Sequence, residues 1–260
     1  MNRTVIAFDT NIWISLVFDK NIFSEIKSKV ESGDILLVVS DITKLEWQRN
    51  RPKIIEERCK PILKAKDDAL KLSEYIIDDE EKEQMVKSIE TSSLKAYEEK
   101  KKQTTSDFDA VEELLHSCDS FDTEVEDKLY VANLAIEKKK PFDGGKNNFN
   151  DALLARSFCK YAAHQKWYLG DVTPMKYDLV YVSNNPKDFI DSNTNNIISE
   201  ITDDIKIPIS IINTKQIAKA LNLSKELIDD YESWVDYMVE HAEQMYLDRA
   251  YLEWEISKGK

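Results

Sequence analysis

The feature that most constrains this fold is a short apolar segment near the start of the chain, which ends in a carboxylate. Residues 4–8 read Thr-Val-Ile-Ala-Phe, a near-continuous apolar run typical of a strand covered on both faces. Asp9, Thr10 and Asn11 follow directly, and we expect Thr10 or Asn11 to cap a helix over 12–17. Asp9 therefore lies where open α/β sheets place their sites, although an aspartate here is equally typical of a plain cap or turn.

Strands and helices alternate after this segment. The predicted elements are a helix over 21–30, a strand over 34–39, a helix from residue 42, and later strands over 178–183 and 207–213. Gly33 lies just past the first of these helices, and Pro208 favours an edge position for the last strand. The alternation predicts an α/β fold with a mostly parallel sheet and right-handed crossovers.

The stretch 61–140 has a different character and is predicted to be a helical insertion. It is dense in lysine and glutamate, and it contains no convincing strand. We expect helices over 54–77, 79–102, 107–116 and 123–139, with breaks near 78–79, 104–106 and 117–121. The domain prediction is a domain over 1–220 that carries this insertion, followed by an amphipathic C-terminal helix over 221–260.

The overall charge is acidic, with a formal net charge of -13 at pH 7. This argues against bulk affinity for nucleic acid, which depends on lysine and arginine, but it suits a nuclease that needs clustered carboxylates. Basic residues do cluster locally, over 44–53, over 100–102 and over 138–146. The three scattered cysteines have no metal-ligand spacing, and no apolar run is long enough to cross a bilayer. We therefore expect a soluble cytoplasmic protein without a membrane partner.

Four acids fall near the ends of predicted strands. Asp9 ends the first strand, and Glu46 lies on the helix after the second. Asp151 opens a helix after a glycine-rich loop, and Asp188 follows the strand over 178–183. Because parallel strands end at one edge of a sheet, we expect these acids to converge there. Carboxylate oxygens favour Mg²⁺ or Mn²⁺, and a common use of such a cluster is phosphodiester hydrolysis.

At these residues the chain resembles the PIN-domain nucleases, in a bacterial branch with a long helical insertion. The blocks that carry the resemblance are Phe8-Asp9-Thr10-Asn11, Glu46 after Ser40-Asp41-Ile42, Phe149-Asn150-Asp151-Ala152-Leu153 with the preceding Pro141-Phe142 and Lys146, and Val182 to Phe189. Their order and spacing match the family over about residues 1–60 and 136–215. The resemblance implies a Rossmann-like α/β/α sandwich and a metal-dependent ribonuclease site.

By position, Asp9, Glu46 and Asp151 match the first three acids of the family and would bind the metal. The place of the fourth acid is taken by Asn185, with Asp188 three residues further on, so either residue would complete the site. The resemblance implies that Mg²⁺ or Mn²⁺ activates a water molecule that attacks the RNA phosphate in line. The substrate contacts it implies are those of Asn11, Arg49, Lys146, Ser183 and Asn185, with Lys44 and Arg51 nearby.

Two other functions remain open at this point. A structure-specific DNA nuclease would use the insertion as a helical arch over its site. A catalytically weak module would instead bind a partner protein through its helical arm and acidic final helix, which the asparagine at position 185 favours. A toxin or defence role, a neutralising protein partner and a homodimer are further alternatives that rest on the resemblance alone.

Overall fold

The structure is a computed structural model of the chain. It describes residues 3–144, 148–168, 177–183, 188–191, 193–194, 196–202, 205, 209–212, 217 and 221. The predicted C-terminal helix over 221–260 therefore falls almost wholly outside the described residues, as do Lys146 and Asn185. The division of the chain into domains stays a prediction.

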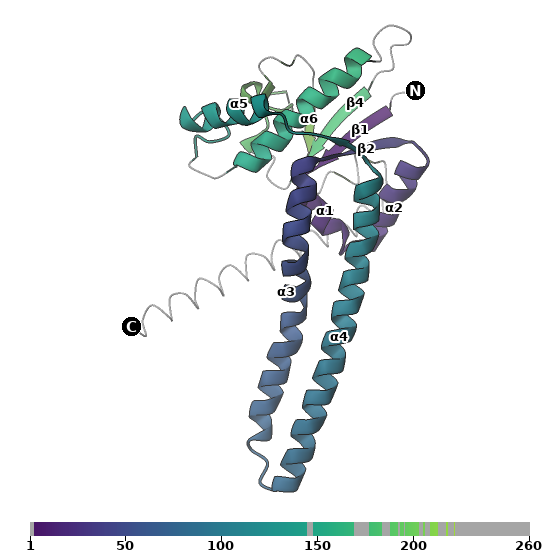
Figure 1. The fold of residues 1–260 in the computed structure, drawn as a ribbon, viewed down its shortest axis with the longest axis vertical. Coiled ribbons are helices and arrows are strands. Elements are labelled where there is room, and N and C mark those ends of the chain that lie inside the picture. The colour runs from purple at the N-terminus through teal and green to yellow at the C-terminus, as the bar shows by residue number, and fades with distance from the viewer. Residues whose placement is uncertain are drawn as a thin grey trace.

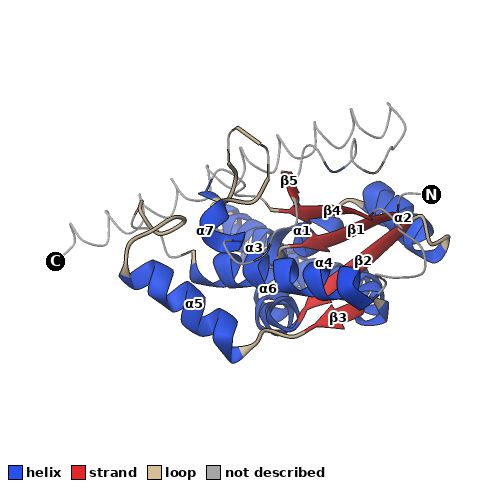
Figure 2. Cartoon of the chain, turned by 90° about the horizontal axis from the view of Figure 1, so that it is seen from above, coloured by secondary structure: helices blue, strands red, loops and turns tan. Residues whose placement is uncertain are grey.

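A five-stranded parallel sheet, in the order β3-β2-β1-β4-β5, forms the centre of the α/β part of the molecule (Figure 2). The strands are β1 (Arg3–Phe8), β2 (Ile35–Ser40), β3 (Asp119–Phe121), β4 (Tyr177–Val182) and β5 (Ser210–Ile212). In the central register, Ile6 lies opposite Leu37 of β2 on one side and Val180 of β4 on the other. The predicted parallel α/β fold is confirmed, and β5 is an edge strand as expected.

Each face of the sheet is covered by its own set of helices. One face packs against α1 (Thr10–Leu16), α2 (Lys20–Glu31), α3 (Asp41–Ser73) and α4 (Asp79–Ser117); the other packs against α5 (Val125–Ile136), α6 (Phe149–Tyr168) and α7 (Ser199–Thr202). Along β1 the side chains alternate, with Ile6 and Phe8 in the first core and Val5 and Ala7 in the second. This burial on both faces explains why β1 reads as a continuous apolar run.

The helices α3 and α4 form a long antiparallel hairpin that projects away from the sheet (Figure 1). With 33 residues, α3 is about 50 Å long at ~1.5 Å per residue. Both helices are continuous, so the predicted interruptions before residue 54 and at 104–106 were wrong. The break near 78–79 is confirmed, because α4 begins at Asp79 with Asp78 as its cap.

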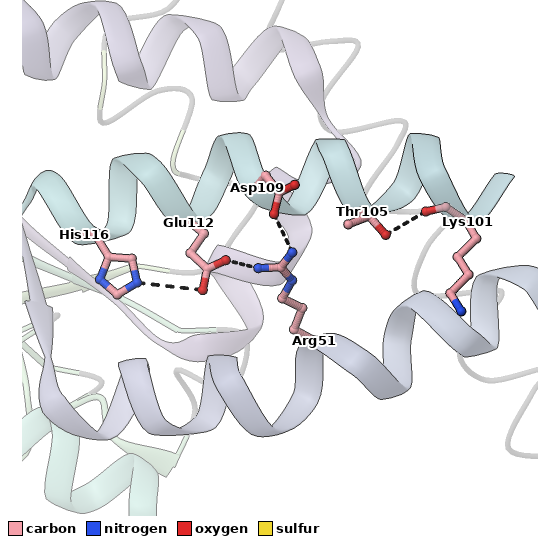
Figure 3. Close-up of polar contacts among 6 residues, drawn as sticks. All are labelled: Arg51, Lys101, Thr105, Asp109, Glu112 and His116. Atoms are coloured by element: carbon pink, nitrogen blue, oxygen red, sulfur yellow. Dashed lines mark hydrogen bonds and ion pairs between the residues drawn. The ribbon is translucent and has the colours of Figure 1, made fainter. Parts of the chain in front are cut away.

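Packing at the base of this hairpin explains why neither helix breaks. Proline within a helix costs roughly 3 kcal/mol, yet Pro52 lies inside α3. Next to it, Trp47 packs on Phe108 of α4, with ring centroids 5.2 Å apart. Arg51 pairs with both Asp109 and Glu112 of α4 (Figure 3). These contacts hold the two helices together just before the proline, and Ile55, just after it, is buried in the same core cluster as Phe108.

Polar residues within α4 are also accommodated by the helix. The hydroxyl of Thr105 donates a hydrogen bond to the carbonyl oxygen of Lys101, one turn back (2.7 Å; Figure 3). Thr104 is buried instead. Threonine hydroxyls disfavour a helix when they bond to backbone groups in a non-helical conformation. The hydroxyl of Thr105 instead bonds to a carbonyl oxygen within α4, so the helix continues.

The strand β3 was not expected, so the prediction that 61–140 contains no strand was wrong. It is only three residues long, Asp-Ser-Phe, and it pairs with β2 from Val38 opposite Asp119 to Ser40 opposite Phe121. Two of its three side chains are exposed, which leaves no apolar pattern to read. The side chains of Cys59, Cys118 and Cys159 are all buried. Among the helices that the structure describes, none combines the length and apolar character needed to cross a membrane.

Candidate active site

Asp9 leaves β1 at the carboxyl edge of the sheet and is almost fully buried, with 4% of its surface exposed. Its backbone N–H donates to the carbonyl oxygen of Val182, at the end of β4 (3.0 Å). Its carboxylate Oδ1 accepts a hydrogen bond from the N–H of Ile12 (2.8 Å) and so caps α1. The prediction that Thr10 or Asn11 caps this helix was wrong, because Asp9 itself is the cap.

Glu46 lies on the second turn of α3, and both of its carboxylate oxygens are held by side chains from other elements. Thr10 Oγ1, on α1, donates to Glu46 Oε2 at 2.5 Å. Asn150 Nδ2, on α6, donates to Glu46 Oε1 at 2.7 Å. The guanidinium of Arg49, one turn along α3, lies 3.6 Å from the same oxygen and is itself 63% exposed. Glu46 is thereby fixed between α1, α3 and α6.

The first turn of α6 brings in the other two acids. Asp151 lies in this turn. Asn148, just before the helix, is buried and donates from Nδ2 to Asp188 Oδ2 (3.0 Å) and to the carbonyl oxygen of Pro141 (3.3 Å). Asn148 and Asn150 therefore each hold one acid, on either side of the point where α6 begins.

The electrostatics of Asp151 show that the four acids are close together. Burial, together with the negative charges of Asp9, Glu46 and Asp188, raises the pKa of the Asp151 carboxyl to about 6. The same surroundings act on Tyr181 in β4: burial first, then Asp9 and Asp151, hold the pKa of its phenol well above the ordinary value. The site thus concentrates negative charge at the carboxyl edge of the sheet.

This donor set fits a hard divalent cation. The repulsion between these neighbouring carboxylates would be reduced by a bound cation. Oxygen atoms are the ligands that Mg²⁺ and Mn²⁺ favour. Within the described part of the chain, no three acids already lie close enough together to hold one ion directly. Mg²⁺ usually keeps several of its waters and needs only one or two carboxylates, so the arrangement suits an ion held partly through water.

Of the remaining predicted site residues, some lie at the same edge of the sheet as the acids and others do not. Ser183 is buried directly after β4, and its N–H donates to Ile212 of β5 (3.1 Å). Asn11 is exposed at the same edge as Asp9. Arg51, expected near RNA, is instead engaged by two acids of α4. Substrate contacts by Asn11, Arg49 and Ser183 stay predictions, as do those of Lys146 and Asn185, which lie outside the described residues.

The sequence predicted none of the three contacts that hold the acids: Thr10 with Glu46, Asn150 with Glu46 and Asn148 with Asp188. The partners of Glu46 are 36 and 104 residues away along the chain, so no local pattern links them. The only available signal was the run Asn148-Phe149-Asn150-Asp151, which places amide side chains next to a candidate ligand.

Replacing Thr10 with valine tests whether this support matters. The substitution keeps the shape of a buried side chain and removes only the donor to Glu46 Oε2. Outer partners of metal-binding carboxylates are typically worth about 10–100-fold in affinity or activity. We expect Thr10→Val to raise the Mn²⁺ concentration needed for half-maximal activity about tenfold, with an unchanged circular dichroism spectrum. Equal metal dependence in the two proteins would contradict a positioning role for Thr10.

Comparison with known proteins adds one match. The sequence model of a family described as PIN domain matches residues 6–189, which is more than half of the chain. The matched range includes all four acids together with the α3–α4 hairpin. No curated protein and no solved structure gives a significant match to the chain.

Proposed function

This chain belongs to the PIN-domain family, whose members are generally metal-dependent nucleases, and from this premise we propose that it is an endoribonuclease that uses Mg²⁺ or Mn²⁺. The observation that carries the proposal is the convergence of Asp9, Glu46, Asp151 and Asp188, seen in the raised pKa of Asp151. Four acids gathered at the carboxyl edge of a parallel sheet are a functional signature rather than a stabilising arrangement.

In this proposal the protein contributes positioning and charge. Asp9 and Asp151 hold the cation together with Glu46, and Asp188 completes the set. A divalent cation bound there would supply the positive charge that activates water and stabilises the phosphate during hydrolysis. Thr10 and Asn150 keep Glu46 in place, and Asn148 does the same for Asp188. Arg49, exposed beside Glu46, would contact a substrate phosphate.

We favour RNA over flap DNA as the substrate. A flap nuclease is expected to carry a helical arch over its site, whereas the α3–α4 hairpin points away from the sheet (Figure 1). A cytoplasmic location, a toxin or defence role and a homodimer remain predictions. A regulatory protein partner is also a prediction; it draws some support from the turn between α3 and α4, where Leu72, Tyr75 and Ile77 are exposed.

The test is a cleavage assay with labelled single-stranded RNA and a flap DNA of equal length. With Mn²⁺ or Mg²⁺ at a saturating concentration, about 100 times the dissociation constant of the ion, we expect RNA cleavage. EDTA should abolish this cleavage. Asp9→Asn, which keeps the cap acceptor of α1 but removes its charge, should reduce cleavage about a hundredfold or more, the equivalent of about 3 kcal/mol.

Each outcome of this assay decides between named alternatives. Cleavage of the flap DNA alone would select the structure-specific DNA nuclease. Absence of cleavage, together with no Mn²⁺ binding by calorimetry, would select the catalytically weak binding module. Cleavage that is equal in wild type and in Asp9→Asn would come from a contaminant or from another site, and it would overturn the assignment.

A further inference from the structure

The outer face of α3 carries a row of basic residues that begins beside the candidate active site. From Glu46 onward, Arg49, Lys53, Lys60, Lys64 and Lys71 follow at intervals of three, four, seven, four and seven residues. At ~3.6 residues per turn these six side chains fall within a sector of about 60°. We refer to the five basic residues, Arg49, Lys53, Lys60, Lys64 and Lys71, as the basic stripe.

This stripe faces away from α4. Ile55 of α3 is buried in the same core cluster as Phe108 of α4, and its direction on the helix is almost opposite to that of the stripe. All five basic residues are exposed. The stripe runs from the carboxyl edge of the sheet toward the far end of the hairpin, over about 33 Å from Arg49 to Lys71 at ~1.5 Å per residue.

Within the described part of the chain, ion pairs engage two of the five basic residues of the stripe, Arg49 with Glu46 and Lys71 with Asp68. Lys53, Lys60 and Lys64 form no ion pair with any residue in the described part of the chain. Asp67 falls within the sector of the stripe, and Glu56, Glu57 and Asp68 lie beside it. Among these four acids the structure records one ion pair with the stripe, between Lys71 and Asp68, at 3.3 Å. Like charges four residues apart, such as Lys60 and Lys64, repel each other by about 0.2–0.5 kcal/mol. A bound polyanion would relieve this repulsion.

We propose that the basic stripe binds the backbone of the same nucleic-acid strand that the active site cleaves, so that the arm selects long single-stranded substrates. This inference rests on the proposed nuclease function. Glu46 lies on the same helix face as the stripe, so a strand lying along α3 would lead directly to the acids. Phosphate binding needs clustered cations, and in a chain with a net charge of -13 this face offers a continuous set beside the site.

The experiment measures binding by fluorescence anisotropy in EDTA, where cleavage is suppressed, with a 5-nucleotide and a 30-nucleotide single-stranded RNA. The test variant is Lys53→Gln/Lys60→Gln/Lys64→Gln, which leaves Arg49 in place. The matched control is Lys87→Gln/Lys100→Gln/Lys102→Gln on α4, where all three lysines are exposed and the loss of charge is the same. Glutamine keeps nearly the helix propensity of lysine, so both variants should fold normally.

We expect the wild type to bind the 30-mer at least about tenfold more tightly than the 5-mer, and the test variant to lose that difference. Because each phosphate contact to a single strand contributes about 0.7 to the slope of log K against log salt, the slope should fall by about 2. The control variant should bind as the wild type does. An unchanged slope in the test variant, an equal loss in the control, or a wild type that does not discriminate length would each overturn the proposal.

Cleavage of the 5-mer with Mn²⁺ separates this inference from the proposed function. If the test variant cleaves the 5-mer normally and loses only its preference for the 30-mer, both proposals are supported. If the wild type cleaves neither RNA but still binds the 30-mer through the three lysines, the nuclease assignment fails and the binding surface stands. If the 5-mer is cleaved and the slope is unchanged, the nuclease assignment holds and the stripe does not bind RNA.

Discussion

Replacing Asp151 with asparagine is expected to abolish cleavage and, at the same time, to make the metal-free protein more stable at neutral pH. The loss of activity should be about a thousandfold, the equivalent of about 4 kcal/mol, because a central carboxylate of the cluster is neutralised. The gain in the free energy of unfolding should be about 2 kcal/mol at pH 7.5. The two effects have opposite signs, which distinguishes a functional acid from a structural one.

The gain follows from the raised pKa of Asp151, which is about 6 in the folded chain against an ordinary value of 3.8. Between these values the folded state binds a proton that the unfolded state has released. The free energy of unfolding therefore falls as pH rises from about 4 to about 6, and the penalty remains in full above that range. Asparagine stays neutral at every pH, so the variant lacks this penalty, which is worth at most ~3 kcal/mol at 1.36 kcal/mol per pKa unit.

Urea unfolding in EDTA at pH 5.0, 6.0 and 7.5 measures the difference between the two proteins. The advantage of Asp151→Asn should be roughly half of its full size at pH 5.0 and should be complete by pH 7.5. Saturating Mn²⁺ should reverse it, because an ion at about 100 times its dissociation constant stabilises the wild type by ~2.7 kcal/mol and has lost a ligand in the variant. A variant that is less stable than the wild type without metal at every pH would show that the acids do not repel one another.

The sequence alone was sufficient to predict the central strands and the meeting of the acids. The strand β1 is an apolar run because both of its faces are buried, and its end fixes the place of Asp9. Once the strands are parallel, Glu46 and Asp151 must approach the same edge. The contacts that hold these acids could not be predicted, because Thr10 and Asn150 reach Glu46 from two other helices.

The continuity of the arm was beyond sequence reasoning for a related reason. Pro52 and Thr104 are local signals against a helix, and they are overridden by packing between residues far apart in the chain. Trp47 and Phe108 are 61 positions apart, yet their rings are in contact, and Arg51 bridges to α4 beside the proline. In β3, by contrast, packing creates an element that the local sequence does not indicate. Its three residues have no strand pattern, and they form a strand because they pair with β2.

Replacing Asp127 with alanine is expected to produce the largest loss of stability of any substitution proposed for this chain. Asp127 on α5 is buried and lies 3.4 Å from Nε of Arg156 on α6, whose side chain is only 4% exposed. Lys160 Nζ lies 3.3 Å from the same carboxylate. Removing the carboxylate takes this charged contact away from a guanidinium that stays buried. Breaking a buried pair from one side typically costs about 3–5 kcal/mol, and we expect a loss in that range by urea unfolding at pH 7.5.

The surroundings of Arg156 make the loss difficult to relieve by rearrangement. Its guanidinium lies over the ring of Tyr130, 4.0 Å from the centroid, and donates to the carbonyl oxygen of Ile201 on α7 (2.7 Å). In Asp127→Ala the contacts with Tyr130 and Ile201 remain, and they keep the guanidinium buried and away from water. Replacing Arg156 with methionine in the Asp127→Ala background removes the buried charge that has lost its contact with Asp127, so the double variant should recover part of the lost stability.

An exposed neighbour supplies the matched control for this experiment. Glu126 precedes Asp127 on α5 and is exposed, and its replacement by alanine should change the free energy of unfolding by less than ~0.5 kcal/mol. Because Arg156 lies about a turn and a half after Asp151 on α6, the folded fraction of Asp127→Ala should also need more Mn²⁺ for activity. A loss below ~1 kcal/mol, or a double variant less stable than Asp127→Ala, would show that this ion pair does not fix α5 to the helix that carries the site.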